Sequence, residues 1–411
     1  MAKGELIAAV DLGSSKVCTV IANFDPDGEV QVLGTGVWTA QGMHKGMVAN
    51  LDEASESLRE SVRRAEHISG LKIRSAYFGV SGAHVSSWNK RSAVAVGRGI
   101  NPVSQWDIKR ALSSAEEPGV QEERKILHAI PKEYILDGRN GVKDPTGMRG
   151  FRLDVDTHIV TVDQATLENM CECVRKAGLK VDGLVLQSLA AAEAVITSDE
   201  VDTGVVLADI GAGTTDIATF RNGTVEHTSV LAVGGNQITR DLAIGLGIPF
   251  EAAEQAKKEH GNLLRVGKNG KEAEATVTLN GGGGVLKADL NDIIRSRIEE
   301  ILKLIFLQVS DNQDYRLRYP AGLVLTGGTA NLPGIDSLAA EVLEVPARIG
   351  VPKAMYGLAD DLSSPAYAGS AGILIWGAKE LQKKRHEEVG FPRKLVGSLR
   401  GFAPHWARSG A

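Results

Sequence analysis

Two short stretches of the sequence place an aspartate at the end of an apolar run and follow it with glycine and hydroxyl side chains. In the first stretch Asp11 ends the run 6–10, and the polar turn after it contains Gly13, Ser14, Ser15 and Lys16. Glycine lets the backbone turn tightly and brings bare amide groups close to a ligand. Amides, hydroxyls and an ammonium group suit a phosphate, and a carboxylate beside them can hold a hydrated cation. The stretch therefore predicts a hairpin that binds phosphate and a cation.

The second stretch, 205–220, repeats the pattern. Its apolar run 205–208 predicts a buried strand, because short continuous apolar runs are typical of strands covered on both faces. Asp209 follows the run, and the turn after it contains Gly211, Gly213, Thr214 and Thr215. Two such hairpins, far apart in the chain, predict two similar half-molecules that face one ligand.

The third motif is a glycine turn, Gly327, Gly328 and Thr329, at the end of another apolar run. A helix is expected near Pro333, because proline is favoured in the first turn of a helix. Each motif alone would also fit an ordinary glycine turn, but the three in this order favour a nucleotide site. Neither hairpin matches the dinucleotide fingerprint or the P-loop, in which glycines at another spacing open a helix.

With these motifs the chain resembles the actin, Hsp70 and sugar-kinase superfamily. The resemblance implies an α/β, actin-like fold of two RNase H-like domains around a nucleotide cleft. It implies that the two hairpins clamp the β- and γ-phosphates of ATP and that the turn 327–329 backs the adenosine. Asp11 and Asp209 would then position hydrated Mg²⁺, since hard cations prefer oxygen ligands and retain several waters.

Four more residues gain a role from this resemblance. Gly235 is expected to contact the nucleotide. Glu254 and Lys257 match the family's ribose and adenine contacts, although two such residues three apart would by themselves indicate a solvated ion pair on one helix face. Gln187 matches the place of a residue that orients water. Because a glutamine cannot act as a general base, we expect ATP hydrolysis, if there is any, to be slow.

Further stretches narrow the resemblance to the FtsA family of bacterial actin-like cell-division proteins. It extends in collinear order from residue 6 to residue 377 and includes "FGVSGAHV", "GLKVDGLVLQSLAAAEAV", "VEHTSVLAVGGNQITRDLA", "AEQAKKEHG", "ARIGVP" and "SPAYAGSAGILIWG". One departure is Ala212, where the family usually has a third glycine; a residue this small is tolerated if its φ is negative. A PilM-like protein of pilus assembly is the alternative, and a small-molecule kinase of the same superfamily is a more distant one.

The order of predicted elements gives the domain layout. A strand–helix–strand–loop–strand order predicts an α+β insert, because it does not continue the surrounding pattern. In the family this insert is subdomain 1C. The predicted segments are a first domain, 1–83 and 162–200, completed by a helix near 364–381; the insert, 84–161, with a loop at 137–150; a second domain, 201–363, with its outer part at about 236–310; a hairpin at 276–287; a charged tether, 379–390; and a tail, 391–411.

The tail carries the second chemical signal. Its apolar side chains at helical spacing are Phe391, Leu395, Leu399 and Phe402, and its basic and aromatic companions are Arg393, Lys394, Arg400 and Trp406. A short basic amphipathic segment suits insertion among anionic lipid headgroups. The FtsA family has a membrane-targeting helix at this place and PilM does not. A helix that docks on a partner or on the parent domain is the alternative.

The family resemblance implies a scaffold rather than a metabolic enzyme. We expect the chain to bind ATP, to form filaments, to receive the C-terminal peptide of FtsZ and to recruit later divisome proteins through subdomain 1C. For the acidic FtsZ peptide, the candidate contacts on the helix expected at 290–309 and just before it are Lys287, Arg295 and Arg297. The expected location is peripheral, on the cytoplasmic face of the membrane at the division site.

Composition sets outer limits on these expectations. The chain has 411 residues, of which 43% are hydrophobic, so two or more domains with substantial cores are expected. A net charge of -5 argues against a nucleic-acid binder, which would present a basic face. Three cysteines cannot form a disulfide framework. We also expect neither a signal peptide nor a membrane-spanning helix, because the N-terminus enters a strand directly and apolar runs are short.

Overall fold

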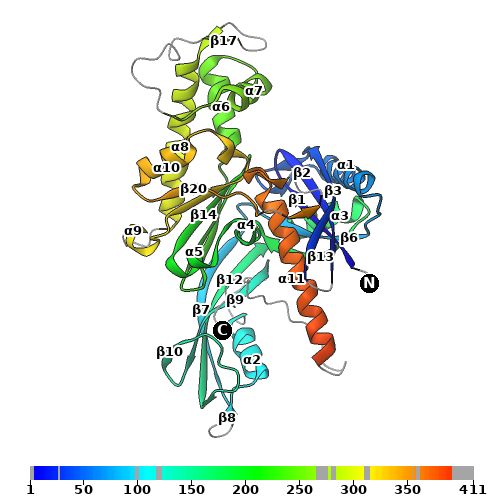
Figure 1. Cartoon of the computed structure of the whole chain (residues 1–411), viewed down its shortest axis with the longest axis vertical. Helices are drawn as coiled ribbons and strands as arrows, with labels where there is room; N and C mark the ends of the chain where they lie inside the picture. Colours follow the sequence, from blue (N-terminus) through cyan, green and yellow to red (C-terminus); the bar gives the residue numbers. More distant parts are fainter. Residues whose placement is uncertain are drawn as a thin grey trace.

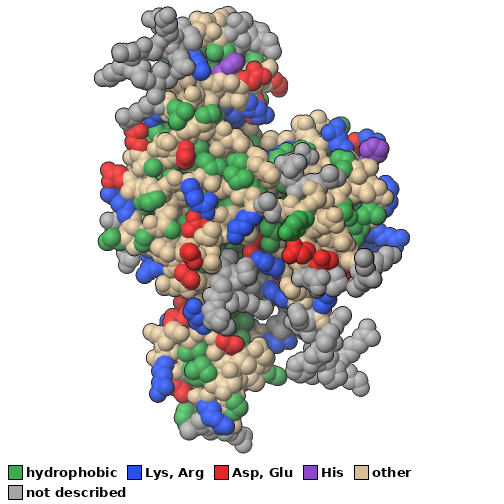
Figure 2. Space-filling model, viewed as in Figure 1, with side chains coloured by type: hydrophobic (Ala, Val, Ile, Leu, Met, Phe, Trp, Pro, Cys, Tyr) green, Lys and Arg blue, Asp and Glu red, His purple; other side chains and the backbone are tan. Residues whose placement is uncertain are grey.

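The structure is a computed structural model. It describes residues 4–25, 28–97, 101–116, 123–264, 276–278, 284–309, 315–353, 355–357 and 362–390. Two large sheets lie side by side, each covered by helices, and a smaller sheet extends below them (Figure 1). On the face drawn in Figure 2, acidic and basic side chains are interspersed.

The first sheet has six strands in the order β13-β6-β1-β2-β3-β21. Their bounds are β1 Glu5–Leu12, β2 Lys16–Phe24, β3 Val30–Thr39, β6 Ser75–Val80, β13 Lys180–Leu186 and β21 Tyr356–Gly357. β1, β2 and β3 pair antiparallel, while β6 pairs parallel with β1 and with β13. Residues 7–10 of β1 are all buried, because helices cover both faces of the sheet.

The second sheet has the order β16-β15-β14-β19-β20. Its strands are β14 Val205–Ile210, β15 Thr215–Arg221, β16 Thr224–Leu231, β19 Leu323–Thr326 and β20 Ala347–Ile349. β14, β15 and β16 pair antiparallel, and β19 pairs parallel with β14 and β20. Each large sheet therefore contains three consecutive antiparallel strands. In each sheet a parallel strand lies beside the first of these three.

Helices cover the large sheets. The first sheet is covered by α1 Leu51–Ser69, α3 Gln164–Lys176, α4 Gln187–Val195 and α11 Ala368–Gly390. The second domain contains α6 Gly235–Leu246, α7 Phe250–His260, α8 Lys287–Val309, α9 Tyr315–Arg318 and α10 Ile335–Leu343, and α5 Ser198–Thr203 precedes it. Two short 3₁₀ helices, η1 Gly328–Asn331 and η3 Pro365–Tyr367, lie beside each other.

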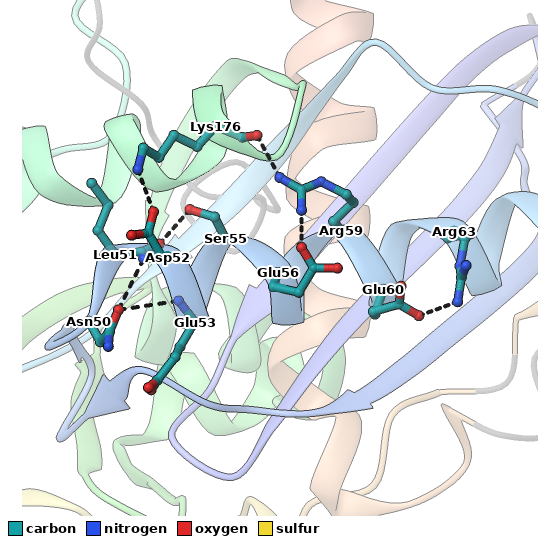
Figure 3. A network of polar contacts seen from close by, with 10 residues as sticks. All are labelled: Asn50, Leu51, Asp52, Glu53, Ser55, Glu56, Arg59, Glu60, Arg63 and Lys176. Atoms are coloured by element: carbon teal, nitrogen blue, oxygen red, sulfur yellow. Dashed lines mark hydrogen bonds and ion pairs between the residues drawn. The ribbon is translucent and has the colours of Figure 1, made fainter.

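Helix α1 shows how the local sequence fixes one of these helices. Asn50 caps its N-terminus, because the Asn50 Oδ1 accepts hydrogen bonds from the backbone N–H groups of Asp52, at 3.1 Å, and Glu53, at 3.3 Å. Lys176 at the end of α3 pairs with Asp52, and its carbonyl accepts a hydrogen bond from Arg59 (Figure 3). The cap and these polar contacts join α1 to α3 on one face of the first sheet.

The insert forms its own four-stranded sheet in the order β10-β9-β12-β7. Its elements are β7 Ser86–Ala95, β8 Asn101–Pro102, α2 Gln105–Glu116, β9 Arg124–Leu136, β10 Arg139–Val142, β11 Arg149–Gly150 and β12 Arg152–Asp163. The loop predicted at 137–150 contains two short strands instead. Its glycines, among them Gly138 and Gly141 with positive φ, make the turns that let β10 pair with β9.

Two short hairpins form small two-stranded sheets of their own. β4 Met43–His44 pairs with β5 Met47–Val48 near the first sheet, and β17 Thr276–Thr278 pairs with β18 Gly284–Leu286 in the second domain. The second hairpin lies where the sequence predicts one, with its tip outside the described residues.

The segment 379–390, predicted as a charged tether, is helical in the structure. It forms the second half of α11. Lys379 pairs with Glu193 of α4, and Arg385 pairs with Glu5 of β1. The charges that suggested a solvated tether therefore hold the helix on the first domain. The tail that follows, with Phe391, Leu395, Leu399, Phe402 and its other candidate residues, lies outside the described residues. Within the part that is described, no helix is long and apolar enough to cross a membrane.

Candidate functional site

The two predicted hairpins are built alike. In β1–β2 the Gly13 N–H donates to the Lys16 carbonyl at 3.1 Å, and in β14–β15 the Gly211 N–H donates to the Thr214 carbonyl at 2.9 Å. Each turn thus begins two residues after its aspartate, at the C-terminal end of the first strand. Since β6 and β19 run parallel to β1 and β14, their C-terminal ends lie at the same edges, where ligands bind in α/β sheets.

The hairpins approach each other at their tips. A Cβ added to Gly213 would lie 2.6 Å from the Ser14 Oγ and 3.1 Å from the Lys45 Cα. The Ser14 Oγ also accepts a hydrogen bond from the Gly46 N–H at 3.1 Å. A side chain at position 213 would therefore push the two tips apart, so the glycine is required by the close approach of the domains.

A cavity of about 400 Å³ lies between the hairpins. Its volume is within the range of small-molecule sites. The predicted site residues that line it are Asp11, Gly13, Ser14, Ser15, Lys16, Gln187, Asp209, Gly211, Gly213, Thr214, Gly235, Glu254, Lys257, Gly327, Gly328 and Thr329. Thr215 does not line it. The Thr215 side chain is fully buried and donates a hydrogen bond to the Val233 carbonyl at 2.8 Å, so it supports the turn from behind.

Three carboxylates dominate the electrostatics of the cavity. Burial raises the pKa of Asp209 well above its usual range, and the neighbouring Asp216 and Asp11 raise it further. Burial also raises the pKa of Asp11, although the Lys16 ammonium and hydrogen bonds from Ser370 and Gln187 oppose this. In the opposite sense, burial lowers the pKa of Lys16. Such a site favours a divalent cation that would neutralise the carboxylates.

Asp216 and Ser81 are site residues that the sequence analysis did not select. Burial raises the pKa of Asp216 to about 7, against hydrogen bonds from Ser81, at 2.7 Å, and Thr214, at 3.1 Å. The Asp216 Oδ1 is buried without a hydrogen-bond partner. The second aspartate of this hairpin was a sequence signal for Asp216. Ser81 lines the cavity because it directly follows β6, and no sequence motif indicated it.

Gln187 lies at the start of α4, directly after β13. Its Nε2 donates a hydrogen bond to the Asp11 Oδ2 at 3.3 Å, and the side chain is packed between Gly79 and Gly369. A Cβ at Gly369 would lie 1.8 Å from the Gln187 Nε2. The glutamine is therefore held beside the carboxylates, in a place suited to orienting a water.

On the other side of the cavity, Lys257 acts as a brace. Its ammonium group donates to the Glu254 carboxylate at 2.6 Å, to the Thr239 hydroxyl at 2.8 Å and to the Gly235 carbonyl at 3.1 Å. Burial alone would raise the pKa of Glu254, but Lys257 and its other partners lower it. A buried ammonium with three acceptors joins α6 to α7, and Glu254 is left at the cavity wall as a charged acceptor.

The glycine turn closes the same side. Gly327 has a φ of +86°, and a Cβ there would lie 2.3 Å from the Asp209 Oδ1. The Thr329 hydroxyl donates to the Gly211 carbonyl at 3.3 Å. The turn is thereby fixed against the second hairpin, and only glycine fits at its first position.

The donor set fits a nucleotide phosphate with a hydrated cation. Glycine turns, hydroxyl side chains and Lys16 line the cavity together with three carboxylates. Among the described residues no group of three or more His, Cys, Asp or Glu side chains is close enough to hold a metal ion directly. Mg²⁺ usually keeps several waters and binds through one or two carboxylates and substrate phosphates, and Asp11 and Asp209 offer two carboxylates at the cavity.

The three candidate cations for the FtsZ peptide all lie on α8, in different surroundings. Arg297 pairs with Asp241 of α6 and with Glu300, and Arg295 donates to the Leu263 carbonyl at 2.8 Å. Both arginines thus hold the second domain together. Lys287 is the first residue of α8 and is partly exposed.

Comparisons with known proteins identify relatives along nearly the whole chain. A family model described as "Cell division protein FtsA" matches residues 206–372, and one described as "SHS2 domain inserted in FTSA" matches residues 82–161. Cell division protein FtsA of Pseudomonas aeruginosa is 34% identical over 392 residues, which cover 92% of this chain and 90% of that protein. FtsA of Escherichia coli strain K12 is 32% identical over 401 residues, covering 94% and 95%.

Solved structures show that the fold is actin-like. The PilM–PilN type IV pilus biogenesis complex contains a chain with a TM-score of 0.64 and 18% identity, covering 90% of this chain and 98% of that one. MreB5 of Spiroplasma citri bound to ADP has a TM-score of 0.54 and 13% identity, covering 94% and 98%. The MamK double helical filament has a TM-score of 0.51 and 14% identity, covering 90% and 98%.

Proposed function

The chain belongs to the FtsA family of cell division proteins, and on that premise we propose that it is an ATP-binding scaffold that polymerises and tethers the FtsZ ring to the inner face of the cytoplasmic membrane. The observation that supports nucleotide binding most directly is the apposition of the two phosphate hairpins across one acidic cavity. The FtsA relatives, at 32–36% identity over most of the chain, favour this function over a PilM-like one, whose structural neighbour is 18% identical.

Different residues of the cavity would bind different parts of the nucleotide. The amides and hydroxyls of the two hairpins, with Lys16, would hold the phosphates, and Asp11 and Asp209 would hold Mg²⁺ through its waters. Bound Mg²⁺ supplies positive charge that offsets the phosphates and the buried carboxylates. Glu254, braced by Lys257, would accept hydrogen bonds from the ribose, and the turn at Gly327 and the residues after it would back the base.

Hydrolysis, where it occurs, would use Gln187 and Asp216 in different roles. Gln187 can orient a water but cannot take its proton. Asp216 lines the cavity with an Oδ1 that has no hydrogen-bond partner, and it is the carboxylate we propose to accept that proton. We propose a slow ATPase, in which nucleotide state serves assembly rather than metabolism.

Self-association into filaments and partner binding follow from the same premise. One structural neighbour is the MamK double helical filament. We propose head-to-tail contacts in which the insert takes part, because its Trp106, Met148 and Phe151 are 64%, 44% and 55% exposed. The insert would also receive later divisome proteins. The FtsZ peptide would dock beside α8, with Lys287, Arg295 and Arg297 as candidate contacts.

Attachment to the membrane would use the tail. Phe391, Leu395, Leu399 and Phe402 give it an apolar stripe, and Arg393, Lys394 and Arg400 add positive charge toward anionic lipid. Because α11 leads directly into the tail, the proposed anchor begins where the first domain ends.

The test of nucleotide binding uses Gly213→Val and Ala212→Gly, measured by calorimetry with ATP in the presence and absence of Mg²⁺. Gly213→Val should abolish binding, because its side chain separates the hairpin tips. Ala212→Gly, which restores the family's three glycines, is the matched control and should bind as the wild type does. A folded Gly213→Val protein with unchanged ATP affinity would refute the assignment of the cavity.

A further inference from the structure

Lys16, the lysine of the first hairpin, is held by the segment that begins α11. Its Nζ donates a hydrogen bond to the Ala366 carbonyl at 2.6 Å and lies 3.7 Å from the centroid of the Tyr367 ring. Ala366 and Tyr367 belong to η3, which runs directly into α11. Lys16 lines the cavity while it makes these contacts. Its ammonium group is thus held in one position by a segment next to the cavity.

The same segment also holds the other domain. The Pro365 carbonyl accepts hydrogen bonds from the Gly327 N–H at 3.0 Å and from the Thr326 hydroxyl at 3.1 Å. Two consecutive carbonyls of η3 therefore bind the glycine turn of the second sheet and the phosphate lysine of the first. The segment spans the cavity from one domain to the other.

The first turn of α11 continues these contacts. The Ser370 hydroxyl donates to the Asp11 Oδ2 at 3.2 Å. A Cβ at Gly372 would lie 1.8 Å from the Ala190 carbonyl, so α11 and α4 meet at backbone distance. Neither helix can shift at this crossing without moving the other.

We propose that Tyr367 is a positioning residue for Lys16 and that, through this contact, the start of α11 responds to the phosphates bound in the cavity. The inference rests on the proposed nucleotide site. An aromatic ring and a carbonyl fix a side chain that otherwise has many rotamers, which prepares Lys16 for an anion. Because binding free energies are reciprocal, phosphates that engage Lys16 must in turn alter the stability of the η3–α11 contacts.

The first experiment compares Tyr367→Leu with Tyr367→Phe in calorimetric binding of MgATP and of AMP. Loss of the ring should weaken MgATP binding by roughly two- to thirty-fold, the range of a cation–π contact. Tyr367→Phe keeps the ring and should retain most of the affinity. AMP binding should change little, because AMP lacks the β- and γ-phosphates proposed to meet Lys16. Equal losses for MgATP and AMP would show general damage to the cavity and overturn the assignment.

A double-mutant cycle with Lys16→Met separates positioning from folding. In the Lys16→Met background, Tyr367→Leu should have no further effect on MgATP affinity, because the side chain it positions is gone. Additive losses would refute the assignment.

Hydrogen exchange of α11 over residues 368–385 tests the response of the helix. MgATP should slow exchange in the wild type and in Tyr367→Phe, and much less in Tyr367→Leu at saturating nucleotide. A wild type that fails to bind MgATP would refute the proposed function. A wild type that binds MgATP without any change of exchange in α11 would refute this inference alone.

Discussion

At the scale of single residues, the negative charges of the cavity carboxylates are unfavourable for folding. Asp209 and Asp216 are buried, Asp11 beside them is partly buried, and Lys16 is the cation whose charge acts on Asp11 and Asp209. Buried carboxylates with raised pKa values destabilise the folded protein near neutral pH, because folding disfavours their ionised form. A ligand that brings Mg²⁺ relieves this, so binding and stability are linked.

Asp209→Asn tests that linkage. Removing one buried charge should raise the melting temperature of the protein without nucleotide, while weakening Mg²⁺-dependent ATP binding by roughly ten- to a hundred-fold, as for the loss of a charge-assisted contact. Calorimetry and thermal unfolding with and without MgATP measure both effects. Asp202→Asn, at an exposed carboxylate, is the control and should change neither. A lower melting temperature for Asp209→Asn would contradict the electrostatic account.

Two buried histidines make the protein sensitive to acid. Burial lowers the pKa of His128 and of His158 to about 3. His158 is hydrogen-bonded to Asn89 at 2.8 Å and to the Thr228 hydroxyl of β16 at 3.0 Å, so it joins the insert to the second domain. In the unfolded chain a histidine becomes protonated as the pH falls below about 6.5. In the folded protein His128 and His158 stay neutral until the pH approaches about 3.

The stability that each histidine contributes is therefore present above pH 6.5 and is lost as the pH falls toward 3, by about 1.4 kcal/mol per pH unit. His158→Gln should flatten the dependence of the unfolding free energy on pH, between pH 6.5 and 4.5, by that amount. Urea unfolding across this range measures it. His67→Gln, at a histidine exposed to water, is the control. Parallel pH profiles for His158→Gln and the wild type would exclude the account.

At the scale of elements, short-range signals fix individual helices. The Asn50 side chain caps α1 by accepting from two backbone N–H groups of its first turn (Figure 3). Asn50→Ala should lower the unfolding free energy by about 1 kcal/mol. Asn50→Asp retains an acceptor and should stay close to the wild type. Chemical denaturation of the three proteins gives the answer, and an Asn50→Ala protein as stable as the wild type would show that the cap contributes nothing.

Helix α11 shows the opposite case, in which tertiary contacts override the local pattern. Its second half is rich in charge and lacks an apolar stripe, yet it is helical. The ion pairs of Lys379 with Glu193 and of Arg385 with Glu5 join it to the first domain, and an i,i+3 pair links Lys383 to Glu380. Glu193 and Glu5 lie far away in the sequence, so the pattern of residues 379–390 alone could not indicate these two ion pairs.

At the scale of the whole molecule, membrane binding should depend on many copies. Burying the four apolar side chains of the tail would contribute roughly 1.5 to 3 kcal/mol each if complete, less the cost of ordering the helix. Basic residues add about 1 kcal/mol each near anionic lipid. One tail should bind weakly and reversibly, and a filament that presents many tails should bind firmly.

Truncation after Gly390 should therefore abolish co-sedimentation with anionic vesicles and leave MgATP binding intact. Leu395→Glu combined with Leu399→Glu should act in the same way, by placing charge on the apolar stripe, whereas Leu395→Ile with Leu399→Ile should still sediment. High salt should weaken attachment without eliminating it, since only the basic residues are screened. If the truncated protein sediments as the full chain does, the tail is not the anchor.

The sequence by itself selected most of the residues that line the cavity. Asp11, Asp209 and the glycines beside them were found because a tight turn after a strand requires particular residue types at adjacent positions. The family followed from the same local motifs in their order, and the comparisons confirm it. Strands with continuous apolar runs, such as β14, were predicted for the same local reason.

Only the tertiary structure decided which side chains meet across the chain. It placed Ser81 on Asp216, turned Lys257 into a brace, removed Thr215 from the cavity wall and set Tyr367 against Lys16. Local spacing could not show these contacts, because each depends on which strand edges and helix ends the packing brings together. Residue types near a turn act over a few bonds, whereas burial and partnership are properties of the assembled core.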